Sequence, residues 1–520
     1  MHPCLSVDEI LRLLARTLAA SKANTTIVVL ACCCKIFEEP MLDELWRAQG
    51  RLTPLLKCFP QDVWIGEGQT FVSPLTTLFP VFSGLIFEKS FKRIPTKEEW
   101  AHSRKYALRM QKLTVDFSEE PVTPNVALVL QLRTINDPWL PRLQTLECKK
   151  VTEAFSPFIP LFLSPKTTEI DIEFARGIPT VVGASMIARL STLCPDLECI
   201  TLNSLPRDLS ITEAVSEMLL ACNRDTLQAF RVDSPLTEEA REVVYRLPRL
   251  SDLWVVIQGP TSLPTMALPN LTSIDVEFDD YFDWLPGFRG ATLEKLESVT
   301  FRSESEKIGD FLKAFESVAL AASAHDTLSV FNFFTSRSWN PNYSSLLSFN
   351  QLKEVRIYVS CEGVCSSRVD DDIIMDMARA MPKLEVLQLG DTPCETPTGI
   401  TVNGLIGLAC LCPYLSKLCI HFQATSLVEA ASSAVTLSPS GDEPVDQWED
   451  CALTDLEVGK IRIPARSGFT VALILLRIFP HILNIKWTNL EWKTVAETIQ
   501  NFGRIGTFVH RLGIARPSRI

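Results

Sequence analysis

A short apolar phrase recurs along most of this 520-residue chain, and it limits what the chain can fold into more than any other feature. The phrase reads apolar-x-x-apolar-x-apolar and often follows a proline, as in PKLEVLQL, which carries Leu384, Leu387 and Leu389. Its first position falls at residues 110, 143, 167, 197, 227, 250, 271, 296, 328, 352, 384, 415, 453 and 482. The mean spacing is about 29 residues, with intervals from 21 to 38, which is typical of an irregular array of stacked repeats.

The segments between these phrases have helical patterns. ASMIARLSTLCP, DDIIMDMARAMP and GLIGLACLCP each carry apolar residues at helical spacing and end at a proline that opens the next phrase. The alternation of strand, helix and proline predicts parallel α/β units that bury their apolar faces only by stacking on one another. We therefore expect an α/β solenoid over residues 105–502, with parallel strands on the concave side and helices on the convex side. The longest interval predicts a disordered insertion at 424–450, because it is rich in Ser, Ala and acidic residues. Residues 503–520 would form a C-terminal tail.

Residues 1–65 follow a different pattern of short helices. Ile10, Leu11 and Leu14 lie at helical spacing, and further helices are predicted from Thr26 to Phe37 and from Pro40 to Trp46. A segment of this size cannot build a large core, so its apolar faces are expected to need a partner surface. Residues 66–104 are predicted to be a linker.

The N-terminal phrases HPCLSVDEILRLL, LACCCKIFEEP and MLDELWRAQGRLTPLLKCFPQDVW, followed by the repeats, resemble the F-box/leucine-rich-repeat proteins, specifically the expanded F-box families of fungi. The motif positions that match are Pro3, Leu5, Ile10, Leu11, Leu30, Cys34, Phe37, Leu45 and Trp46. The resemblance implies a small all-α F-box that binds a Skp-type adaptor and, through it, a cullin. The repeats would then present a protein substrate to the ubiquitin ligase.

The adaptor-binding residues that the resemblance implies are Pro3, Leu5, Ile10, Leu11, Leu14, Leu30, Cys34, Phe37 and Trp46. An alternative of another class is a protein-interaction scaffold whose F-box segment no longer recruits an adaptor.

The candidate substrate surface follows from strand geometry. Side chains alternate between the two faces of a strand, so the residues between the phrase residues should line the concave sheet. The face is acidic toward its N-terminal half, as at Glu169, Asp171 and Glu173, and gains arginine and aromatic residues toward the middle. The predicted substrate-binding residues are Asp252, Trp254, Asp275, Glu277, Arg302, Arg356 and Tyr358, and Val256 is expected on the same face. Our hypothesis is that this face captures a protein with a basic segment.

The chain shows no chemistry that predicts an enzyme. It lacks a phosphate-binding loop and the common nucleophile and metalloprotease motifs, and its six histidines are scattered, so no cofactor or metal is expected. Asp370, Asp371 and Asp372 precede an apolar run and are interpreted as acids at a helix start rather than as a metal cluster. A net charge of −12 argues against general nucleic-acid binding.

The 16 cysteines lie mostly within apolar runs, which is typical of reduced thiols that pack as small hydrophobes, and Cys32 to Cys34 are interpreted in the same way. The opening residues do not form a basic signal-peptide start, and no apolar run reaches the ~18 residues that span a bilayer. We therefore expect no membrane association, and a location in the cytoplasm or nucleus.

Overall fold

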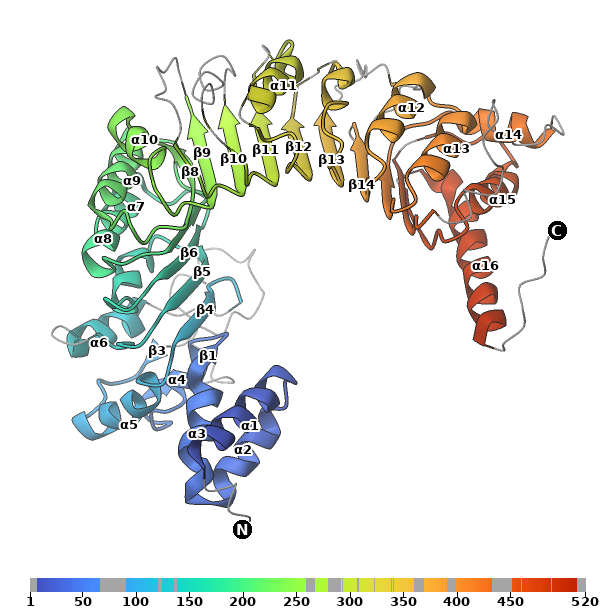
Figure 1. Ribbon diagram of the computed structural model, residues 1–520. Coiled ribbons are helices and arrows are strands. Elements are labelled where there is room, and N and C mark those ends of the chain that lie inside the picture. Colours follow the sequence, from blue (N-terminus) through green and yellow to red (C-terminus); the bar gives the residue numbers. More distant parts are fainter. Residues whose placement is uncertain are drawn as a thin grey trace, which may run out of the picture. The chain divides into compact units, whose positions relative to one another are not determined.

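The computed structural model describes residues 7–65, 90–119, 124–134, 138–258, 267–278, 291, 293–305, 308–321, 323–337, 339, 341–359, 369–390, 399–432, 451–459, 461–487 and 489–511 (Figure 1). The chain divides into two compact units, residues 1–250 and residues 251–520. Each unit contains a ladder of parallel strands with helices alongside, so the fold is the α/β repeat solenoid that the sequence predicts.

The first unit opens with three helices, α1 (Asp8–Ala20), α2 (Asn24–Cys33) and α3 (Lys35–Arg47). The predicted continuous helix from Thr26 to Phe37 is wrong, because Cys34 takes an extended conformation (φ −160°, ψ 139°) and separates α2 from α3. The Cys34 carbonyl then accepts the first hydrogen bonds of α3, from the backbone N–H groups of Phe37 and Glu38. Pro40 consequently lies inside α3 and not at a helix start.

The rest of the first unit builds the first ladder, in the strand order β1-β4-β5-β6-β7-β8. Its strands are β1 (Ala48–Gln49), β4 (Lys112–Asp116), β5 (Thr145–Val151), β6 (Glu169–Phe174), β7 (Cys199–Asn203) and β8 (Ala229–Pro235). Its other elements are α4 (Thr53–Leu56), β2 (Trp64–Ile65), β3 (Ser90–Phe91), α5 (Lys97–Ala107), α6 (Pro124–Thr134), η2 (Ser156–Leu161), α7 (Thr180–Ile187), α8 (Leu190–Leu193), α9 (Leu209–Ala221) and α10 (Glu238–Val244). The helices α7 to α10 run along one side of the strands (Figure 1).

The second unit continues the same construction, in the order β9-β10-β11-β12-β13-β14-β15-β16-β17. Its strands are β9 (Asp252–Ile257), β10 (Ser273–Phe278), β11 (Ser298–Ser303), β12 (Val330–Thr335), β13 (Glu354–Val359), β14 (Val386–Leu389), β15 (Lys417–Cys419), β16 (Asp455–Gly459) and β17 (Asn484–Trp487). Its helices are α11 (Phe311–Ala321), η5 (Tyr343–Leu346), α12 (Asp371–Ala380), α13 (Val402–Leu411), α14 (Ala424–Ser432), α15 (Gly468–Ile478), η7 (Leu490–Trp492) and α16 (Lys493–Arg511).

The repeat phrase marks every strand of the two ladders from β4 onward. Each of its fourteen first positions lies two residues before a strand and is at most 1% exposed. The one polar case, Thr167, is also fully buried, and its hydroxyl donates to the Leu143 carbonyl of the preceding repeat (3.1 Å) and accepts from the Ser164 N–H (3.2 Å). A polar side chain is tolerated there because both of its hydrogen-bonding functions are satisfied.

Three predicted boundaries need correction. The predicted linker, residues 66–104, contains most of α5, whose Trp100 is buried and stacks between Phe59 and Trp139, at centroid distances of 5.8 and 6.0 Å. Residues 424–432 of the predicted disordered insertion form α14, because Ala424 and Leu427 are buried against the neighbouring repeats. The remaining part, residues 433–450, lies outside the described residues. The predicted tail begins inside α16, which continues to Arg511.

The described residues include twelve cysteines, all free, and they differ in exposure. Burial raises the pKa of Cys194 to about 11 and of Cys222 and Cys412 to about 12. Cys32 and Cys33, in contrast, are exposed on α2. Because the thiolate is the reactive species, we expect iodoacetamide at pH 8 to alkylate Cys32 and Cys33 at least a hundredfold faster than these buried thiols. Peptide mapping by mass spectrometry measures the rates.

The same experiment has an unfolded control. In denaturant without a reductant, nearly all 16 cysteines should react, because none is expected to be in a disulfide. Equal alkylation rates for Cys33 and Cys412 in the folded protein would contradict the assigned burial.

Candidate protein-binding surfaces

The three N-terminal helices pack around a small core of their own. It consists of Leu11, Ala15, Ile27, Phe37 and Met41. Further residues that pack against this core include Leu14, Leu30, Cys34 and Leu45. Of the predicted adaptor-binding residues, Leu11 is 1% and Phe37 is 8% exposed, so their side chains are not available to a partner in this packing. Pro3 and Leu5 lie outside the described residues.

Helix α2 presents apolar residues to solvent. Val28, Val29, Cys32 and Cys33 are all exposed and form a stripe at helical spacing, which we call the α2 face. The interpretation of Cys32 and Cys33 as packing residues is therefore wrong, and only Cys34 packs against the core. A helix that is apolar on all sides is normally buried on all sides, yet Ile27 is the only fully buried residue of α2. The α2 face consequently has the character of a contact surface for another protein.

Exposed apolar residues also occur on the two neighbouring helices. Ile10, which the sequence assigned to adaptor binding, is 41% exposed on α1, and Leu13 one turn further on is 64% exposed. On α3, Ile36 is 46% exposed. Each of the three helices thus contributes apolar surface, although the residues that do so are mostly not those that the sequence pattern indicated.

An ion-pair network fastens the helices to the first ladder. The Arg109 guanidinium, 9% exposed, pairs with Glu39 and Asp43 of α3, and Arg12 of α1 reaches the same Asp43 at 2.8 Å. The chain leaving α3 becomes β1, which pairs with β4, and the Gln111 N–H donates to the Arg47 carbonyl at 2.8 Å. The helical segment is therefore joined directly to the repeat array instead of hanging from a linker.

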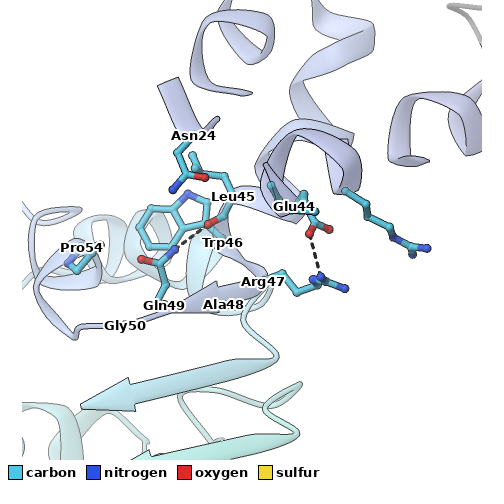
Figure 2. Close-up of a pocket in the computed structure, with 12 residues that line it drawn as sticks. Asn24, Glu44, Leu45, Trp46, Arg47, Ala48, Gln49, Gly50 and Pro54 are labelled. Atoms are coloured by element: carbon cyan, nitrogen blue, oxygen red, sulfur yellow. Dashed lines mark hydrogen bonds and ion pairs between the residues drawn. The ribbon is translucent and has the colours of Figure 1, made fainter. Parts of the chain in front are cut away.

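A pocket of about 630 Å³ lies between the helices and β1 (Figure 2). Trp46, predicted for adaptor binding, lines this pocket together with Asn24 and Gln49, and its ring contacts that of Tyr106 at 4.9 Å. At the rim, Glu44 and Arg47 form an ion pair of 3.0 Å. Trp46 thus packs at the junction of the helices and the ladder, a position that the sequence did not indicate.

The outward face of the first ladder is rich in carboxylates. Strand pairing aligns one residue from each of four neighbouring strands in a row across the ladder: Thr114, Glu147, Asp171 and Thr201. Within this row, Glu147 accepts a hydrogen bond from Thr114 (3.1 Å), and it also pairs with Lys149 (2.9 Å). Burial, with a further contribution from the charge of Glu147, raises the pKa of Asp171. This face therefore has an excess of negative charge, as predicted from the sequence.

The outward face of the second ladder brings the predicted substrate-binding residues together. They alternate with buried residues in β9, β10, β11 and β13, and strand pairing places Trp254 beside Asp275 and Glu277 beside Arg302. Arg302 pairs with Asp275, and Arg356 pairs with Glu354 at 2.8 Å. Val256 departs from the alternation and is 3% exposed. The sequence predictions omitted Phe334, whose ring centre lies 6.2 Å from that of Tyr358. The alternation of β12, in which Phe331 and Phe333 are buried, could have indicated its outward position.

The structure also gives findings on metal binding, on the acidic run at Asp370 to Asp372 and on membrane spanning. Within the described ranges, no three His, Cys, Asp or Glu side chains gather so as to hold a metal ion. Asp370 caps α12 by accepting a hydrogen bond from the Ile373 N–H at 3.1 Å, so the acidic run begins a helix as predicted. None of the described helices has the length and apolar character that crossing a membrane requires.

Comparison with known proteins adds little to this geometry. No protein-family model matches the chain. No curated protein matches it either. Among solved structures, this chain is similar to a chain in the crystal structure of the Rad7 and Elc1 complex in yeast, with 13% sequence identity and a TM-score of 0.36. The match covers 56% of this chain and 72% of the yeast chain.

Proposed function

We propose that this chain is the substrate-recognition subunit of a cullin-based ubiquitin ligase. The three N-terminal helices bind a Skp-type adaptor, and the outward faces of the ladders hold a protein substrate. The observation that carries this proposal is the α2 face, an exposed apolar stripe on a helical segment that is fastened directly to a repeat array. The resemblance of residues 1–65 to F-box segments supplies the identity of the partner.

The chemistry of this role is binding alone. The substrate-recognition subunit positions a substrate and carries no reacting group, and we propose no catalytic residue for this chain. Such a role places the protein in the cytoplasm or nucleus, where ubiquitin ligases of this type act.

The proposal is tested by changing the α2 face. Replacing Val28 and Val29 together by aspartate should weaken binding to a Skp-type adaptor by ~100-fold or more, because it places two charges in an apolar interface. Co-expression followed by affinity purification and titration calorimetry measures the loss. Both positions are about half exposed, at 45% and 55%, so the fold should tolerate the change.

A matched control is available on α7. Val181 is 77% exposed, and Val181→Asp makes the same chemical change outside the proposed interface, so adaptor binding should be unaltered. Full binding by the Val28→Asp/Val29→Asp variant would exclude the α2 face as the docking site. A wild-type chain that fails to bind any Skp-type adaptor would favour the second candidate function, a scaffold that uses only its repeats.

A further inference from the structure

A cluster of aromatic rings surrounds one arginine on the outward face of the second ladder. The Arg302 guanidinium carbon lies 5.4 Å from the ring centre of Trp254 and 5.8 Å from that of Phe334, and Phe334 neighbours Tyr358. We call these four residues the aromatic cluster. They come from β9, β11, β12 and β13, and the strand pairing of the ladder holds them on one face. Trp, Tyr and Arg at such a centre are the residue types that dominate binding hot spots.

The charges around the aromatic cluster favour a cationic ligand. Arg302 is already paired with Asp275, and Arg356 with Glu354. The outward faces of these strands carry two more carboxylates, Asp252 and Glu277, so the six charged side chains sum to −2. Because these six charges sum to a negative value, the local field favours a cationic ligand, which can also stack on the face of Tyr358.

Two polar atoms indicate that the ligand includes a peptide backbone. Within the described part of the chain, the Trp254 indole N–H and the Asn332 side-chain oxygen are buried without a hydrogen-bond partner, while the Asn332 amide nitrogen donates to Thr300 (3.2 Å). Trp254 and Asn332 belong to the same row, three strand spacings apart, or ~14 Å. An extended chain covers that distance in about four residues and supplies both the carbonyl and the N–H that these atoms lack.

The Trp254 indole N–H becomes reachable if the side chain above its ring moves. Arg302 lies over the Trp254 ring and is 40% exposed, so it has room to shift toward solvent. Unsatisfied buried donors and acceptors are rare in folded proteins, because each loses its hydrogen bonds to water. Pairing with a ligand backbone would remove that cost.

We infer that the aromatic cluster binds an extended peptide segment that carries lysine or arginine side chains. This inference rests on the proposed function, because it names the class of substrate segment that the outward face reads. The segment would run across β9 to β12, its main chain would meet Trp254 and Asn332, and its cationic side chains would lie near Asp252 and Glu277.

The test uses the full chain and three fluorescein-labelled peptides, GAKAKAKAG and its counterparts with glutamine or glutamate in place of lysine. Fluorescence anisotropy at 50 mM and 150 mM salt should show that the lysine peptide binds about tenfold more tightly than the glutamine peptide, with the glutamate peptide weakest. Trp254→Ala should weaken lysine-peptide binding by about tenfold. Asp252→Asn with Glu277→Gln should weaken it and reduce its salt dependence.

A charge-matched control separates a local site from the general acidity of the protein. Asp455→Asn with Glu457→Gln removes the same two charges from β16 of the same unit, and we expect at most about a twofold change, because screening limits charge effects to ~10 Å. Three results would overturn the inference. They are no binding of the lysine peptide at concentrations up to about 1 mM, equal affinity for the lysine and glutamine peptides, or an equal loss of lysine-peptide affinity in the control variant. Tighter binding of the glutamate peptide would overturn it as well and identify an anionic ligand. Adaptor binding depends on the α2 face, so a failed peptide experiment with retained adaptor binding leaves the proposed function standing.

Discussion

Replacing Leu11 and Phe37 together by alanine is expected to unfold helices α1 to α3. Deletion of buried side chains of this size costs roughly 2–5 kcal/mol each, and among the described residues the core that holds the three helices has five buried members. A core this small contributes only a few kcal/mol in total, so the double change exceeds what the segment can lose. Hydrogen exchange with mass spectrometry should show residues 8–47 unprotected while the strands of the first ladder remain protected.

The neighbouring residue Ile10 supplies the control. It is 41% exposed, so Ile10→Ala should change the stability of the segment by no more than about 0.5 kcal/mol. If the Leu11→Ala/Phe37→Ala variant kept full exchange protection and still lost adaptor binding, the two residues would act at the surface, as the family pattern implied. The experiment therefore decides between a core role and a contact role for these positions.

The second large effect is expected at Asp371, which joins two consecutive repeats. Its carboxylate accepts hydrogen bonds from the Thr401 N–H (2.7 Å), the Thr401 hydroxyl (2.5 Å) and the Gly404 N–H (3.1 Å), so a residue of α12 caps the start of α13. Asp371→Ala leaves these donors unpaired in a half-buried place and should cost about 2–4 kcal/mol. Urea unfolding together with hydrogen exchange of α12 and α13 measures the loss.

Asp372 allows the capping contribution to be separated from the general effect of charge. It lies in the same first turn of α12 and is exposed, so Asp372→Ala removes an equivalent helix-dipole interaction worth only about 0.3–1 kcal/mol. Equal losses for the two variants would show that Asp371 acts through the dipole alone.

The local packing explains why glycine follows in α13. A side chain on Gly404 would place its Cβ 2.5 Å from the Asp371 carboxylate, so the short distance that permits the cap also requires a residue without a side chain.

The repeat phrase by itself determined the ladder. The first position of the phrase is apolar in all repeats but one and lies two residues before a strand, so it is expected to be buried, and the period-2 alternation that follows it assigns the inward and outward faces. This is why the outward positions of Trp254, Asp275, Arg302 and Tyr358 could be predicted from the sequence. Their function as a binding surface stays a prediction.

Tertiary structure decided what the sequence pattern left open. Sequence spacing shows that Leu11 and Phe37 are apolar, but only the packing of three helices decides that they face each other while Val28 and Val29 face solvent. In the same way, no local signal indicated that α5 packs its Trp100 between Phe59 and Trp139, because those partners lie about 40 residues away on either side of it in sequence. The aromatic cluster likewise needs residues from four strands, and its geometry exists only because the parallel pairing brings those strands into register. Local periodicity follows from backbone geometry, whereas contacts between distant segments depend on the whole packed array.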